Sequence, residues 1–144
     1  MPYDLLADGD RPEIRVGATT LFELFERAGH AMFDLGFDLS SVTPRHSRPV
    51  VAVGDTIGEL LGDWLEQLRL VAVEHNLVFS YFVVDRLEEG GVQGSAAGLP
   101  RGEVIRRARS VSGVAGRVPE PIDGPAGWSV DLAFHTEPRL RGVE

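Results

Sequence analysis

Hydrophobic residues recur at two different spacings along the chain, and the spacings predict helices in the first half and strands in the second. Over residues 20–35 they return every three or four positions, which is typical of a helix with one apolar face. The same spacing over residues 57–74 predicts a second helix, which His75-Asn76 closes. Both segments begin with Thr-x-x-Glu, at Thr20 and Thr56, the spacing of a capping box.

Alternating or β-branched segments predict the strands. They cover Glu13–Ala18, Val50–Val53, Leu77–Asp85 as a central strand, Val92–Leu99, one or two strands within Val104–Val118, and Trp128–Phe134. The first ten residues, which lead into Asp8-Gly9-Asp10-Arg11-Pro12, and the segment Pro119–Gly127 are rich in turn formers. We therefore expect turns in both places.

The order of these elements predicts an α+β fold. A strand, a helix, a strand and a helix are followed by four or five strands with short connections, which favours an antiparallel sheet. We expect a two-layer domain with two helices packed on one face of a mostly antiparallel sheet. The length of 144 residues suits one domain over residues 1–144, and the charged tail from Glu137 is expected to be flexible.

Composition excludes several kinds of chemistry. The chain contains no cysteine, so it has no disulfide, zinc-thiolate site or cysteine nucleophile. All 14 basic residues are arginine, which removes lysine Schiff-base chemistry and a phosphate-loop lysine. The N-terminus lacks the features of a signal peptide and no apolar run is long enough to span a membrane, so we expect a cytoplasmic protein.

Charge is distributed unevenly along an acidic chain. The formal net charge is −8, whereas the segment from Arg101 to Arg117 carries five arginines and one glutamate. An acidic chain repels nucleic acid as a whole, so any contact with RNA or phosphate is expected in this segment. The alternative is that these arginines lie on the solvated face of a strand. The candidate partner or phosphate contacts are Arg106, Arg107, Arg109 and Arg117.

Acidic residues near the two ends of the chain form a candidate metal site. Asp8 and Asp10 precede the first predicted strand, and His135 follows the last one. If the two strands end side by side, Asp8, Asp10 and His135 can surround a Ca²⁺ or Mg²⁺ ion. The alternative is that they are ordinary solvated residues of an acidic chain. A third hypothesis is a hydrolase that uses the same three side chains.

Several short stretches, taken in order, resemble the archease family. They are Ile14-Arg15-Val16, Thr20 to Phe25, Ala31-Met32-Phe33, Asp38 to Val42, Asp63 to Leu68, Leu77-Val78-Phe79 and Gly127-Trp128 before the last strand. The resemblance extends over about residues 3–135, which is nearly the whole chain. No single stretch is specific, but their order and spacing together are characteristic.

The resemblance implies a small α+β protein that assists the RNA-splicing ligase of tRNA splicing. In the family it promotes guanylylation of the ligase, so that contact with RNA is indirect, and it is not itself an enzyme. The family's divalent-metal site uses one aspartate that precedes the first predicted strand, Glu13–Ala18, and another that closes the last predicted strand, Trp128–Phe134. The resemblance therefore implies a ligase partner and a Ca²⁺ or Mg²⁺ cofactor.

The chain departs from the family at the positions that should carry function. Aligned from Arg15, the first metal aspartate falls on Arg11, although a shift of one residue restores Asp10. The second falls on His135, and Arg117 stands in a stretch that reads Thr-Tyr-His in the family. These replacements favour an alternative hypothesis: a divergent binding or interaction module that has lost the metal site and ligase activation.

Overall fold

The computed structural model describes residues 3–139, and within this range the chain forms two helices, α1 (Leu21–Gly36) and α2 (Ile57–His75). The strands of the described range are β1 (Tyr3–Ala7), β2 (Glu13–Ala18), β3 (Phe37–Asp38), β4 (His46–Val53), β5 (Leu77–Glu88), β6 (Gly91–Pro100), β7 (Ile105–Arg106), β8 (Arg109–Val114), β9 (Ile122–Gly124) and β10 (Gly127–Pro138). A short 3-10 turn covers Arg101–Glu103.

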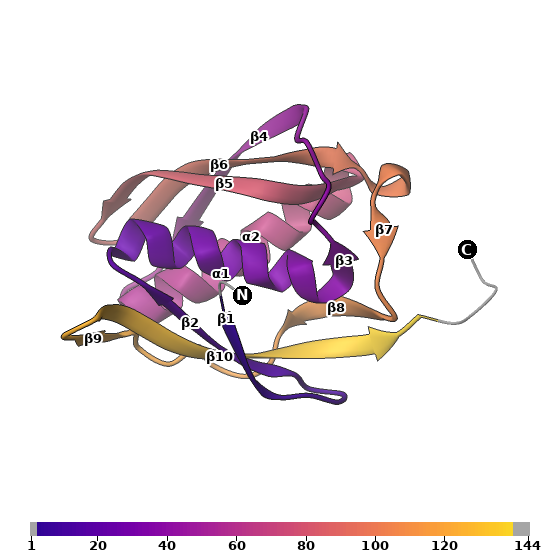
Figure 1. The fold of residues 1–144 in the computed structure, drawn as a ribbon. Helices are drawn as coiled ribbons and strands as arrows, with labels where there is room; N and C mark the ends of the chain where they lie inside the picture. Colours follow the sequence, from indigo (N-terminus) through magenta and orange to yellow (C-terminus); the bar gives the residue numbers. More distant parts are fainter. Residues whose placement is uncertain (1–2, 140–144) are drawn as a thin grey trace.

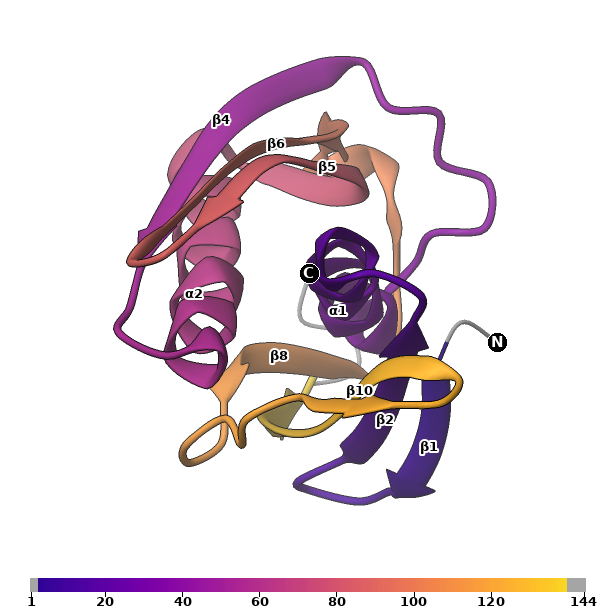
Figure 2. The ribbon, with the colours of Figure 1, turned by 90° about the vertical axis from the view of Figure 1, so that its left-hand side faces the viewer.

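The strands divide into two main antiparallel sheets with α1 between them (Figure 1). One sheet has the order β1-β2-β10-β8, with β9 paired to β10, and the other has the order β4-β6-β5. Figure 2 shows α1 at the centre with one sheet on each side and α2 along the edge of both. The short pair β3-β7 bridges the two sheets beside the end of α1.

The α+β class with two helices and mostly antiparallel sheets is confirmed. The arrangement of layers differs from the expected single sheet, since α1 packs on β5 on one side and on β2, β8 and β10 on the other. A helix in this position has to bury most of its circumference, and nine residues of α1 are buried. Within the described range neither helix is both long and apolar enough to cross a membrane.

Both predicted helix starts are confirmed. The hydroxyl of Thr20 accepts a hydrogen bond from the Glu23 N–H, and that of Thr56 accepts one from the Glu59 N–H, each at 3.1 Å. These bonds satisfy N–H groups that have no partner inside the helix. At the other end of α2, Asn76 adopts the left-handed conformation that closes a helix.

The core joins the two helices at Trp64. Its side chain is fully buried, and its indole N–H donates to the carbonyl of Phe25 at 3.1 Å. Burying an indole without a partner for its N–H costs free energy, so this bond fixes the position of α2 against α1.

Three strand predictions are corrected. The first ten residues are not all turn, because β1 pairs with β2 from Tyr3 onward. As an edge strand β1 buries only Tyr3, so it has no alternating pattern to detect. Segment Pro119–Gly127 contains the short strand β9 within its turns. The strand predicted at Val50 begins at His46, where polar residues already pair with β6.

The predicted central strand is an edge strand. β5, which covers the predicted Leu77–Asp85, pairs only with β6, and the glycine-rich β6 lies at the centre. β6 can lie this close to β5 because its glycines have no side chains. A Cβ atom at Gly94 or Gly98 would overlap a main-chain carbonyl of β5. The aromatic residues of β5 are explained instead by its packing against α1.

The prediction of a flexible tail from Glu137 is wrong for residues 137–139. Glu137 and Pro138 pair with β8 at the end of β10. Arg139 donates from its main chain to the Ala108 carbonyl at 2.8 Å and from its side chain to three further carbonyls. Residues 140–144 of the expected tail lie outside the described residues.

Candidate functional site

The turn between β1 and β2 meets the start of β8 through an ion pair. The Asp8 carboxylate lies 2.7 Å from the guanidinium of Arg109 and accepts the Gly9 N–H at 2.8 Å. These two contacts, the Gly9 bond first, lower the pKa of Asp8. One predicted metal ligand and one predicted phosphate contact therefore bind each other.

The same turn also contacts the end of β10. The main-chain carbonyl of Asp10 accepts the hydroxyl of Thr136 at 2.8 Å, and that of Pro12 accepts the Phe134 N–H at 3.1 Å. The expected convergence of the first turn and the last strand is thus present in the main chain. The exposed His135 is the residue beside Thr136 in β10.

These residues do not fit a Ca²⁺ or Mg²⁺ site. In residues 3–139, no three His, Asp or Glu side chains gather in a way that could hold a metal ion. Hard cations need several oxygen ligands, and the Asp8 carboxylate is already held by a guanidinium. The carboxylate of Asp131, on the same strand as His135, is likewise held by Arg15, at 2.8 and 3.0 Å, and this bond lowers its pKa.

Arg107 closes the end of α1. Its Nε donates to the carbonyls of Asp34 and Phe37 at 2.6 and 3.1 Å, and its Nη2 lies 3.2 Å from the Asp34 carboxylate. A cation at this position complements the negative end of the helix dipole. The other carboxylate oxygen of Asp34 accepts the Tyr3 hydroxyl at 2.6 Å. Burial first, and then the Asp34 carboxylate, raise the pKa of Tyr3 above its usual value, so the hydroxyl remains a donor.

An open cavity of about 630 Å³ lies beside this network. It combines donors from Arg107 and Arg109 with carboxylates from Asp34 and Asp38, and Ser40 donates to Asp38 at 2.7 Å and lowers its pKa. These charges suit a complementary polar surface of a partner better than an apolar ligand. Its lining residues are Tyr3, His30, Asp34, Leu35, Asp38, Leu39, Ser40, Arg107, Ala108 and Arg109.

The four predicted arginines do not form one cluster. Arg107 and Arg109 line the cavity, whereas the exposed Arg106, which pairs with Phe37, lines another pocket together with Arg101. Arg117 is 81% exposed and lies 3.9 Å from Glu59, in the first turn of α2. It therefore belongs to the opposite end of α2 from Arg101, whose main chain binds the Asn76 carbonyl.

Sequence reasoning missed Tyr3, Asp34 and Arg139. A usable signal existed for Asp34, since His30 and Asp34 are four residues apart on the same helix and both line the cavity. Tyr3 lies in an edge strand without alternation, and Arg139 lies in a segment that reads as a charged tail. Neither could be placed without knowing which strands pair.

Comparison with known proteins gives consistent results. The profile of the Archease protein family (MTH1598/TM1083) matches residues 8–113. Protein archease of Methanopyrus kandleri is 37% identical over 103 residues, which covers 69% of this chain and 74% of that protein. Protein archease of Methanosarcina mazei is 32% identical over 84 residues, which covers 58% of each protein.

A solved structure shares the fold. The solution structure of Methanobacterium thermoautotrophicum protein 1598 superposes with a TM-score of 0.76 at 22% identity, covering 93% of this chain and 98% of that chain. The structural likeness thus extends beyond the profile match and includes most of the chain. Together with the profile match over more than half of the sequence, these comparisons show that the chain belongs to the archease family.

Proposed function

We propose that this chain is a non-catalytic accessory protein of an RNA-splicing ligase in tRNA splicing, and that it promotes guanylylation of the ligase. Membership of the archease family and the 37% identity to protein archease of Methanopyrus kandleri support the proposal. The ligase partner comes from the family resemblance, and contact with RNA is indirect.

The observation that carries the proposal is the position of Arg106. It is exposed and lines a pocket with Asn76, Arg101, Gly102 and Val104, none of them acidic, on a molecule of formal charge −8. A local positive surface on a negative molecule steers an acidic partner to one place and repels it elsewhere. Because Arg107 and Arg109 are also bound to Asp34 and Asp8, Arg106 is the residue most available to the partner.

The proposal is tested by the turnover of the cognate ligase with and without the purified chain. We expect a complex on gel filtration and an increase in guanylylated ligase over repeated cycles. Arg106→Gln should weaken the complex and the activation together, since Arg106 is exposed. Arg86→Gln is the matched control, because Arg86 is also an exposed arginine and lies near the end of β5.

No complex and no gain in guanylylation would overturn the proposal. That result would instead support the second candidate function, an interaction module that keeps the archease fold without ligase activation. The ion pairs Asp8–Arg109 and Arg15–Asp131 favour this candidate, because they occupy carboxylates at the place where the family resemblance implies a metal.

A further inference from the structure

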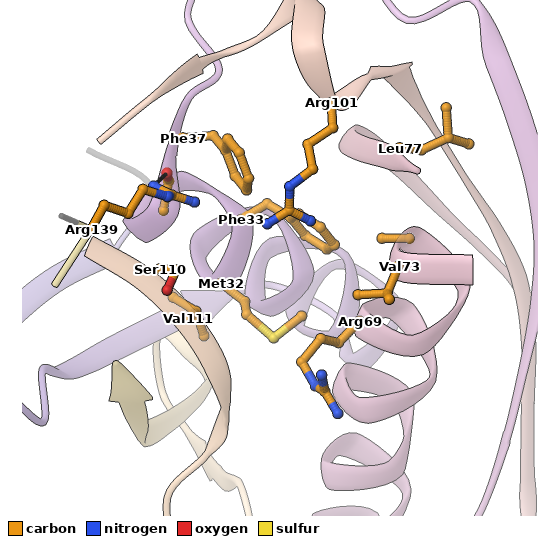
Figure 3. A pocket seen from close by; sticks show the side chains of 12 residues that line it. Met32, Phe33, Phe37, Arg69, Val73, Leu77, Arg101, Ser110, Val111 and Arg139 are labelled. Atoms are coloured by element: carbon orange, nitrogen blue, oxygen red, sulfur yellow. Dashed lines mark hydrogen bonds between the residues drawn. The ribbon is translucent and has the colours of Figure 1, made fainter. Parts of the chain in front are cut away.

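A second, smaller cavity lies between the C-terminal halves of α1 and α2 and the start of β8 (Figure 3). Its volume is about 70 Å³. Its walls are mainly apolar, with arginine side chains as the charged groups around it. The lining residues are Met32, Phe33, Gly36, Phe37, Arg69, Ala72, Val73, Leu77, Arg101, Ser110, Val111 and Arg139.

The Phe37 ring holds two of the arginines in place. The guanidinium carbon of Arg139 lies 4.8 Å from the ring centroid, and that of Arg101 lies 5.4 Å from it. Contacts of this kind attract a cation to the ring face and restrict its motion. Figure 3 shows Phe37 between these two arginine side chains.

The charges of these two arginines are not balanced within the described residues. Arg69, the third arginine of the cavity, forms two bonds of 2.9 Å with Glu66, whereas no carboxylate of residues 3–139 pairs with Arg101 or Arg139. The lining residues include no aspartate or glutamate. Among residues 3–139, the cavity therefore carries about two positive charges without a paired carboxylate, since arginine stays protonated.

One buried donor of Arg139 also lacks a partner. Its Nη1 donates to the carbonyls of Gly36, Arg107 and Arg109 at 2.7 to 2.8 Å, which fixes the group firmly. Its Nη2 is buried and has no hydrogen-bond partner among the described residues. A buried donor without an acceptor is costly, so an anion that accepts from it would be bound favourably.

The surroundings of Arg139 also lower the pKa of its guanidinium group. Burial is the largest cause, and the positive charges of Arg101 and Arg106 follow. A bound anion would relieve both the mutual repulsion and the loss of hydration.

We propose that this cavity binds a phosphate monoester whose ester group is compact and apolar or aromatic. A phosphate monoester carries up to two negative charges near neutral pH, which matches the two uncompensated guanidinium groups, whereas a carboxylate carries one. The volume of about 70 Å³ admits little more than the phosphate group, so the ester group lies at the open side of the cavity, against the 58% exposed Val73. This site adjoins the Arg106 surface proposed for the ligase, because Arg101 lines both places, but its test does not use the ligase.

The test is calorimetric titration of the purified chain with phenyl phosphate, with benzyl alcohol as a neutral probe and inorganic phosphate as a probe without an apolar group. We expect saturable binding of phenyl phosphate, weaker binding of inorganic phosphate and none of benzyl alcohol. Arg101→Gln should weaken phenyl phosphate binding by about tenfold or more, the loss expected for a charge-assisted contact. Arg86→Gln, which removes the same charge at the far end of β5, should leave it within about twofold.

A second pair of variants leaves every arginine in place. Val73 lines the cavity and is 58% exposed, so Val73→Asp places a carboxylate near the guanidinium groups without disturbing the core. It should abolish binding of phenyl phosphate. Leu70→Asp, on an exposed position of the same helix that does not line the cavity, should not.

The proposal is overturned if phenyl phosphate does not bind saturably, or if it binds Arg101→Gln and Val73→Asp as tightly as the original chain. If inorganic phosphate binds as tightly as phenyl phosphate, the proposed contact with an apolar ester group is wrong. If benzyl alcohol binds as tightly as phenyl phosphate, the proposed contact with the guanidinium groups is wrong.

Discussion

Arg139 donates from one nitrogen atom to the carbonyls of Gly36, Arg107 and Arg109, and so joins the end of β10 to the end of α1 and to β8. The last carbonyls of a helix have no partner within the helix, and a guanidinium near them satisfies them with charge-assisted bonds. The residue is therefore both a structural clamp and one wall of the small cavity.

Replacement of Arg139 by glutamine should lower the free energy of unfolding by about 2 kcal/mol, because hydrogen bonds to a charged group are lost. Urea denaturation of both chains measures the difference. Arg86→Gln serves as the control, since Arg86 is exposed and only 3.5 Å from Glu88, and it should change stability little. Equal stabilities of the two variants would contradict the role assigned to Arg139.

The pair of Arg15 and Asp131 makes stability depend on pH in a known direction. Arg15 lowers the pKa of Asp131 in the folded chain, so the pair stabilises the fold above the unfolded-state pKa of about 3.9. That contribution is lost as pH falls through the lower, folded-state pKa. Both side chains are substantially exposed, so the contribution is below about 1 kcal/mol.

Asp131→Asn should therefore be less stable than the original chain at pH 7, and the difference should shrink as pH falls below about 4. Urea denaturation at several pH values measures it. A difference that stays constant between neutral and acidic pH would show that the ion pair contributes nothing.

Helices and strands could be predicted where neighbouring residues in the sequence determine them. The capping residues Thr20 and Thr56 fix the starts of both helices, and their bonds are those that the capping-box spacing predicts. The same logic does not identify neighbours in a sheet. β6 reads as a weak strand because it is rich in glycine, yet the absence of side chains is what lets it lie at the centre, between β4 and β5.

Gly94→Ala should lower the free energy of unfolding by about 1 to 3 kcal/mol, the usual cost of overpacking. The new methyl group would overlap the Val83 carbonyl and lie 3.0 Å from the Trp64 ring. Thermal unfolding monitored by circular dichroism measures the loss.

Gly102→Ala is the matched control for this substitution. Nothing lies within 4 Å of a methyl group at that position, and its backbone is not one that requires glycine. It should be nearly neutral. A similar melting temperature for Gly94→Ala and Gly102→Ala would contradict the account of β6.

At the scale of the whole molecule, the sequence predicts the class of the fold but not its layers. Apolar spacing shows that α1 has a buried face, but does not show that sheets cover it on two sides. Likewise, Asp8 and Arg109 each stand out in the sequence, but only the pairing of β1, β2, β10 and β8 brings them together. The sequence predicted a metal site because it does not show that Asp8 pairs with Arg109, which lies far away along the chain.

Asp8 and Asp131, near the place where the first turn meets β8 and β10, are paired with guanidinium groups and should not take up a divalent cation. Thermal unfolding of the chain in the presence of increasing Ca²⁺ or Mg²⁺, against NaCl at equal ionic strength, measures this. We expect the melting temperature to follow ionic strength alone, because Asp8 and Asp131 are already paired with Arg109 and Arg15. A saturable, cation-specific rise that Asp8→Asn abolishes would contradict the account.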